Sequence, residues 1–157
     1  MDTKAMAIQI GIVIGLPQLQ LDDRGLALVQ IEGCPSLHIE ADPDGQCLHL
    51  YSIVASNVHS VLHDACLMLL KGNTFGSKTG GASLAFDEPA GEIILCARLE
   101  DMVVGADALK NYLERFAAAA KYWVAEYEMH ARTSARAAAP QNAVAFRRDW
   151  QLLAGRV

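Results

Sequence analysis

The order of structural elements follows from residues 57–100, NVHSVLHDACLMLLKGNTFGSKTGGASLAFDEPAGEIILCARLE, where a helical pattern gives way to two strand patterns. In the first part, apolar side chains recur at steps of three and four residues, as on one face of a helix. Asn57 is suited to cap the start of this helix, and Gly72 and Asn73 are suited to end it. A flexible glycine-rich connector then leads to two apolar runs, ASLAF and EIILCARL, separated by turn-forming residues. The centre of the protein is therefore predicted as a helix, a connector and a β-hairpin.

Upstream of this centre, the sequence predicts three strands joined by short turns, at residues 26–32, 36–41 and 46–54. The middle strand alternates apolar and polar residues, as expected when one face of a sheet is covered and the other meets water. The first and third strands carry apolar residues on both faces. The second face of the sheet is therefore expected to be covered by another helix, a second subunit or a bound chain.

Two further segments complete the pattern. Residues 5–15 alternate like a strand and also fit a helix face, so periodicity alone leaves both structures open. From about Ala106 into the 130s, a helix is predicted with Asp107 as its N-cap. Its apolar stripe, expected to be core, comprises Leu109, Leu113, Phe116, Ala120, Trp123 and Tyr127. The order α-βββ-α-ββ-α predicts an α+β domain with a twisted antiparallel sheet of about five strands and helices on one side.

The composition is that of one globular domain: 157 residues, of which 52% are hydrophobic. No apolar run is long enough to span a membrane, and the N-terminus lacks the small-residue cleavage site of a signal peptide. Four cysteines without a CxxC pair are most simply reduced thiols.

The charge is uneven along the chain. Residues 1–127 carry 8 basic and 16 acidic side chains, a net charge of −8, whereas residues 128–157 carry five arginines and two acids, a net charge of +3. An acidic body argues against nucleic-acid binding. We expect a domain over residues 1–130 and a basic C-terminal extension over 131–157, helical or partly disordered, in which a last amphipathic turn or two can form at 142–153.

Motifs that could carry chemistry are incomplete. GNTFGSKT at 72–79 resembles a phosphate-binding loop but has Ser77 where that loop needs glycine, and it follows a helix rather than a strand. His59 and His63 share a helix face without the glutamate or third ligand of a metalloprotease site. No GxSxG motif is present. We therefore expect no catalytic residue, no metal site and no cofactor.

Cys47 and His49 lie two residues apart on one strand face and suggest a thiol–imidazole pair. Catalysis by such a pair requires an activated thiol and a third group that orients the histidine, and the sequence identifies no such group. A small enzyme using Cys47 with His49 or His38 is therefore kept only as an alternative.

Several stretches resemble the Tir-chaperone family, the class I chaperones of bacterial type III secretion. They are GLPQLQLDDRGLALVQIEG, LHLYSIV, LLKGN, GGASLAFDEPAGEIIL and LKNYLERFAAAAKYWVAEY, over about residues 5–127. The more specific parts are the helix ending Leu69, Leu70, Asn73 and the run from Gly80 to Asp87. The resemblance does not extend to residues 128–157.

The resemblance implies a homodimeric chaperone in the bacterial cytoplasm, without catalytic activity. It would hold the N-proximal segment of a secreted effector extended, soluble and ready for the export ATPase. It also implies that residues 5–15 form a helix, and that the central helix and fourth strand make the dimer contact. A dimeric regulatory module of similar fold, binding a folded partner, is the alternative.

Specific contact residues are expected on this basis. Effector contacts are expected from apolar residues of the first element and of the two-sided strands: Ile8, Ile12, Leu26, Leu28, Tyr51 and Ile53. Dimer contacts are expected from Leu67, Leu70, Leu84 and Phe86. For each of these residues, ordinary core packing is the alternative. In the basic extension, acidic surfaces could be contacted by Arg132, Arg136, Arg147 and Arg148.

Overall fold

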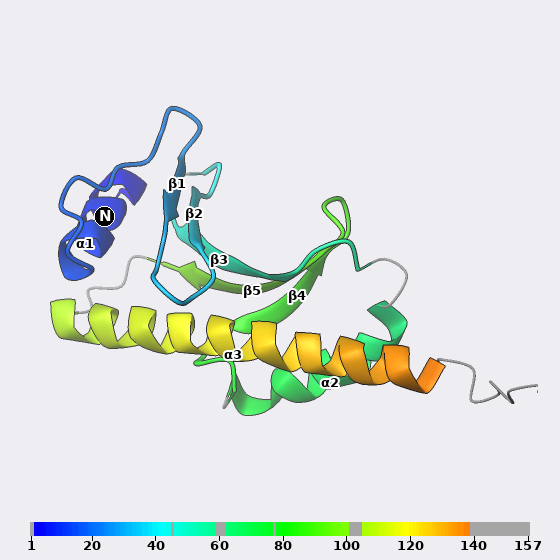
Figure 1. Ribbon diagram of the computed structural model, residues 1–157. Coiled ribbons are helices and arrows are strands. Elements are labelled where there is room, and N and C mark those ends of the chain that lie inside the picture. The colour runs from blue at the N-terminus through cyan, green and yellow to red at the C-terminus, as the bar shows by residue number, and fades with distance from the viewer. Residues whose placement is uncertain (1, 45, 59–61, 77, 101–104, 139–157) are drawn as a thin grey trace, which may run out of the picture.

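A five-stranded sheet with helices against one face forms the framework of the protein (Figure 1). The computed structural model describes residues 2–44, 46–58, 62–76, 78–100 and 105–138. The elements are α1 (Thr3–Val13), β1 (Leu26–Val29), β2 (Leu37–Ala41), β3 (Leu48–Ala55), α2 (Leu62–Gly72), η1 (Thr74–Gly76), β4 (Ser83–Asp87), β5 (Glu92–Leu99) and α3 (Ala106–Ala138). The predicted α+β class and element order are confirmed.

All neighbouring strands of the sheet are antiparallel, in the order β1-β2-β3-β5-β4. The crossover between β3 and β5 leaves β1 and β4 at the two edges. Alternate residues of β2, β3 and β5 are buried, and their side chains form the sheet side of the core: Leu37, Ile39, Leu48, Leu50, Ile93 and Leu95.

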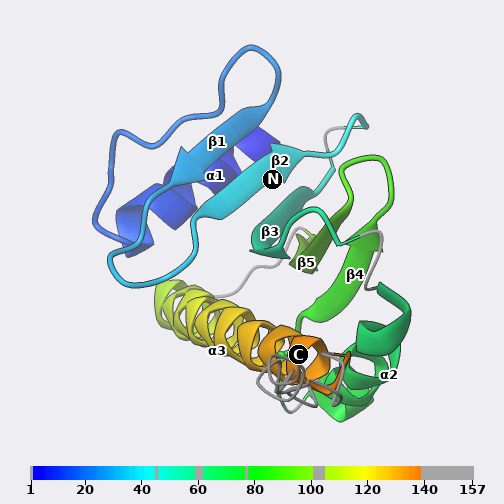
Figure 2. The ribbon, with the colours of Figure 1, turned by 45° about the vertical axis from the view of Figure 1, so that its right-hand side comes forward.

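The helices lie together on that face of the sheet. Figure 1 shows α3 running beneath the strands with α2 beside its second half, and Figure 2 shows α1 behind β1 and β2. The stripe predicted as core is confirmed, with Leu113, Phe116, Ala120, Trp123 and Tyr127 buried. The predicted cap of α3 is wrong. The Gly105 carbonyl accepts the first helical N–H groups, from Ala108 and Leu109, and Asp107 lies within the first turn.

Residues 5–15 lie in a helix up to Val13, as the resemblance implied. The carboxylate of Asp2 caps α1 by accepting from the Ala5 N–H at 2.7 Å. Gly11 is needed in mid-helix because a Cβ there would collide with the Leu16 carbonyl and the Leu19 side chain. A local cost in helix propensity is therefore offset by close packing of the chain that follows α1.

The central helix ends at Gly72 as predicted, but its start differs. Asn57 has φ of +58°, in the left-handed region, whereas an N-cap residue is extended. The segment 59–61 lies outside the described residues, so the His59–His63 pair is not tested.

The connector between α2 and β4 packs against α3 rather than forming a solvated link. The Trp123 indole donates to the Lys78 carbonyl at 3.0 Å, and Thr79 is fully buried. A Cβ on Gly80 would lie 3.0 Å from the Arg115 carbonyl oxygen. The glycines predicted to give flexibility therefore permit close packing and positive φ angles.

Helix α3 ends at Ala138, in the 130s as predicted, so the first part of the predicted basic extension is helical. Arg132 lies 3.8 Å from Glu128 on the exposed side of this helix, and Arg136 lies in its last turn. Arg147, Arg148 and the pattern at 142–153 lie outside the described residues. Among the described helices, none is long and apolar enough to cross a membrane.

Candidate functional site

The sheet face turned away from the helices is the first candidate site, and we call it the outer face. Strand register places Leu28 opposite His38, His38 opposite Tyr51, and Ile53 opposite Ile94 on this face. Leu26, Leu28, Tyr51 and Ile53, all predicted as effector contacts, therefore lie on the same face. The α-helices α1, α2 and α3 lie on the opposite side of the sheet (Figures 1 and 2).

The centre of the outer face is apolar and only partly covered. Tyr51, Ile53 and Ile94 are half-buried by neighbouring strands, and Leu28 is 53% exposed. The rings of His38 and Tyr51 stack with centroids 4.7 Å apart. The predicted surplus of apolar groups is therefore real, and no described helix of the same chain buries it.

Acidic side chains surround this apolar centre. Partial burial, followed by the charges of Glu40, Glu92 and Asp87, raises the pKa of Tyr51. These carboxylates come from β2, β5 and β4, so the negative charge spans the sheet. A ligand of the outer face would be favoured by apolar groups flanked by basic ones.

The edge of the sheet at β1 is open at Leu28. Backbone groups of an antiparallel edge strand point alternately to the neighbouring strand and away from it. The Ala41 N–H donates to the Gly25 carbonyl across the β1–β2 pair, which directs the peptide groups of Leu26 and Leu28 outward. At Leu26 both peptide groups are bonded to Asp22: the Asp22 N–H donates to the Leu26 carbonyl, and the Asp22 carboxylate accepts from the Leu26 N–H. Among the residues that the structure describes, none bonds to the N–H and C=O groups of Leu28, which are therefore open to an added strand.

An apolar groove of about 640 Å³ lies near this edge, between the end of α1, the end of β1 and α3. Its lining includes Val13, Ile14, Leu16 and Ile31, none of which was predicted as a contact. Each belongs to a segment with an apolar pattern, but only the packing of α1 on α3 shows that a groove forms there.

The predicted contacts Ile8 and Ile12 lie away from the outer face. They are 41% and 61% exposed and lie one turn apart on α1, which packs against α3 and β3 on the helical side of the sheet. A ligand that contacts both sets must pass around the β1 edge.

The predicted dimer contacts fall into two groups. On α2, Leu67 and Leu70 are 62% and 67% exposed and offer apolar area to another molecule. Leu84 is buried in the core of its own chain, and Phe86 packs partly buried against that core. Strand β4 thus contributes mainly to the core against which α2 packs, and the exposed apolar surface in this region comes from α2.

Asn73 connects α2 to β4, a role that the sequence did not reveal. Its carboxamide donates to the Leu84 carbonyl at 3.1 Å and accepts from the Leu84 N–H at 2.7 Å. The side chain thereby occupies the place that the peptide group of a further strand would take. The β4 edge is blocked at this residue, in contrast to the β1 edge at Leu28.

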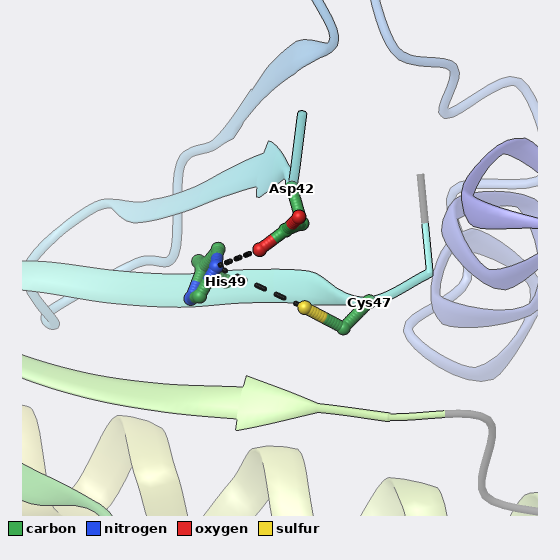
Figure 3. A group of neighbouring side chains, drawn as sticks. All are labelled: Asp42, Cys47 and His49. Carbon is green, nitrogen blue, oxygen red and sulfur yellow. Dashed lines mark hydrogen bonds and ion pairs between the residues drawn. The ribbon is translucent and has the colours of Figure 1, made fainter. Parts of the chain in front are cut away.

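The suspected thiol–imidazole pair forms and gains a third group. His49 Nε2 lies 3.8 Å from Cys47 Sγ and 3.2 Å from Asp42 Oδ2 (Figure 3). Both partners meet the same ring nitrogen, whereas a catalytic triad places the thiol and the orienting acid on different nitrogens. The Arg98 Nε also donates to Cys47 Sγ, at 3.1 Å. This arrangement lacks the geometry of an activated nucleophile.

The open apolar face, the free edge at Leu28 and the exposed apolar residues of α2 define a protein-binding domain. The chain belongs to the Tir chaperone protein (CesT) family, whose sequence profile matches residues 8–124. This is a family of chaperones rather than of enzymes.

Solved structures of three protein complexes share the fold, and one of these complexes is from a type III secretion system. A chain of the ExsC–ExsE complex aligns with a TM-score of 0.60 at 20% identity, over 79% of this chain and 95% of that one. A chain of the ExoU–SpcU complex from Pseudomonas aeruginosa gives 0.57 at 21% identity, over 76% and 94%. A chain of the HopA1–SchA chaperone–effector complex gives 0.57 at 19% identity, over 80% and 92%. No curated protein sequence matches the chain significantly.

Proposed function

We propose that the protein is a type III secretion chaperone that binds the N-proximal segment of an effector in extended form. The observation that carries the proposal is the outer face, an apolar surface that no helix in the described part of the chain covers. It lies next to an edge strand in which the peptide groups of Leu28 meet no partner strand among the described residues. The family match and the chaperone–effector complex of the same fold support it.

The binding mode follows from the contrast between the two sheet edges. An effector segment would add as a strand beside β1, where backbone hydrogen bonds supply affinity, and not beside β4, where Asn73 occupies the edge at Leu84. Alternate side chains of the added strand would extend the outer face, near Leu28 and Tyr51. The acidic surroundings favour a segment in which apolar residues are interspersed with lysine or arginine.

The same effector chain would continue from the β1 edge to the helical side of the sheet. A chain leaving the β1 edge can reach the groove between α1 and α3 and then the exposed face of α1 with Ile8 and Ile12. An extended segment can contact both sides because it need not keep a globular shape, which a folded partner cannot do.

The proposal includes a homodimer formed through α2, with Leu67 and Leu70 as its main contacts. Leu84 and Phe86 would act from beneath by positioning α2. Replacing Leu67 and Leu70 together with glutamate should convert the dimer to a folded monomer, because buried like charges would face each other across the two-fold axis. Sedimentation velocity measures this directly. A wild-type monomer at micromolar concentration would contradict the dimer.

The wider setting is proposed on the family membership alone. The protein would act in the bacterial cytoplasm, without catalysis, and would present the bound effector to the export ATPase. The basic extension would contact acidic surface through its arginines. Deleting residues 131–157 should then reduce secretion, and unchanged secretion and stability would contradict a role for the extension.

The test of effector binding starts with capture of partners from the native cell by the full chain, followed by limited proteolysis of the complex. A partner held in extended form should yield one resistant N-proximal segment. Replacing Leu28 with glutamate should weaken capture at least about tenfold, because it places a charge on the apolar contact. The control is Met129→Glu on α3, where the side chain is 54% exposed, close to the 53% of Leu28. Equal capture by both variants would refute the site.

A further inference from the structure

Three metal-ligating side chains of different chemistry converge where β2 turns into β3. Asp42 follows β2, Cys47 precedes β3, and His49 lies within β3 (Figure 3). One ligand atom from each lies within 4.8 Å of the other two. We infer that this group is a binding site for a zinc-like divalent cation, formed by a thiolate, an imidazole and a carboxylate.

The distances between the ligand atoms are close to those of a zinc site, and small rotations of the side chains would complete the geometry. With Zn–S about 2.3 Å and Zn–N or Zn–O about 2.0–2.2 Å, neighbouring ligand atoms of a tetrahedron lie roughly 3.3–3.6 Å apart. The imidazole nitrogen lies 3.2 Å from the carboxylate and 3.8 Å from the sulfur. Cys47 and Asp42 both face Nε2 of His49, which does not suit a catalytic triad. The same arrangement suits a metal, because each of the three ligands supplies one atom to a common centre.

The surrounding hydrogen bonds orient the ligands. Asp42 Oδ1 accepts from the Asp44 N–H at 3.0 Å, which leaves Oδ2 directed at His49. The backbone closes the same turn, since the Asp42 N–H donates to the Cys47 carbonyl at 3.0 Å. Support of this kind holds metal ligands in place before binding.

Arg98 is the group that a cation must accommodate. Its Nε donates to Cys47 Sγ at 3.1 Å and so occupies one side of the sulfur that a metal would bind. The side chain is 55% exposed, and the same Nε lies 3.4 Å from Glu100 Oε1. The guanidinium can therefore turn to Glu100 when the sulfur binds a metal. The thiolate and the carboxylate then balance the two positive charges of the ion.

Access and coordination number also fit a zinc-like ion. Cys47 is fully buried, but the His49 and Asp42 side chains are 42% and 23% exposed, so an ion can enter from solvent. Three protein ligands leave one tetrahedral position for water. Mixed sulfur, nitrogen and oxygen ligands favour zinc over magnesium or calcium, which prefer oxygen alone.

The test is titration of the full-length, reduced protein with Co²⁺ and then Zn²⁺. We expect one Co²⁺ per chain with a thiolate-to-cobalt charge-transfer band that Zn²⁺ displaces. Cys47→Ser should abolish the band, and His49→Ala and Asp42→Asn should each weaken affinity at least about tenfold. Because the last two side chains are partly exposed, these variants report on binding even if Cys47→Ser fails to fold.

The matched controls are Cys66→Ser on the exposed surface of α2 and Cys34→Ser in the turn before β2, both of which should bind as the wild type does. The inference is overturned if no metal binds at micromolar concentration, if the cobalt spectrum lacks the thiolate band, or if either control variant abolishes it. It does not depend on the effector, so it stands or falls separately from the proposed function.

Discussion

Replacing Asn73 with alanine tests the connection between α2 and the β4 edge. The change removes two hydrogen bonds to the Leu84 peptide groups, at 3.1 and 2.7 Å. Each is worth about 1 kcal/mol net, and leaving the peptide groups of a residue that is 6% exposed without partners adds about 1 kcal/mol. We therefore expect the free energy of unfolding to fall by about 2–3 kcal/mol, and the melting temperature by roughly 5–10 °C.

The assay is urea denaturation followed by tryptophan fluorescence at one fixed protein concentration, since dimerisation would make stability depend on concentration. The control is Asn111→Ala, the same substitution at an exposed position of α3, which should change the free energy by no more than about 0.5 kcal/mol. If Asn73→Ala unfolds within about 0.5 kcal/mol of the wild type, the carboxamide does not stabilise the β4 edge.

Two further predictions concern packing and pH. A Cβ at Gly72 would collide with the Trp123 ring. Although alanine has the better helix propensity, Gly72→Ala should therefore lower the free energy of unfolding, measured with urea, by at least about 1 kcal/mol. The control is the neighbouring exposed residue, where Lys71→Ala should leave this free energy unchanged. A backbone N–H of its own turn, and then His49, hold the pKa of Asp42 below its ordinary 3.8. The charged carboxylate therefore stabilises the folded protein at pH values above the ordinary pKa. Near neutral pH, with a chelator present, the urea midpoint of the wild type should be higher than that of Asp42→Asn. That advantage should vanish as the pH falls through the lowered pKa, and a constant difference would contradict this.

Most of the fold could be predicted because the decisive patterns are local. The hairpin at 82–99 has two apolar runs around a turn, and the α3 stripe keeps helical spacing over five turns. Residues 5–15 could not be assigned from periodicity, and Gly11 argued against a helix. The reason for this glycine is visible only in the fold, where the chain turns back and leaves no room for a Cβ beside Leu16 and Leu19.

The candidate site was predictable only in part. Two-sided apolar strands indicated an uncovered face, and Leu28 and Tyr51 lie on it. The same pattern did not show that Leu84 faces inward, because strand alternation gives two faces without saying which one the helices cover. The group around His49 was incomplete in the sequence because Asp42, seven residues away, approaches it only when the hairpin closes.

The pairing of Asn73 with Leu84 was also hidden from the sequence. A side-chain amide at a helix end is a common terminator, and nothing in its local pattern indicates that it faces a strand edge eleven residues later. This contact distinguishes the two sheet edges, and the proposed binding mode depends on that distinction.

Strand addition at β1 can be measured by hydrogen–deuterium exchange of the full chain, with and without its captured partner segment. We expect exchange to slow at the Leu28 amide and its neighbours in β1. In the partner, only the residues that pair with this edge should be protected, and the rest should exchange as an unfolded chain does. Unchanged exchange in β1, or a partner protected throughout as a folded domain, would refute binding of an extended segment at this edge.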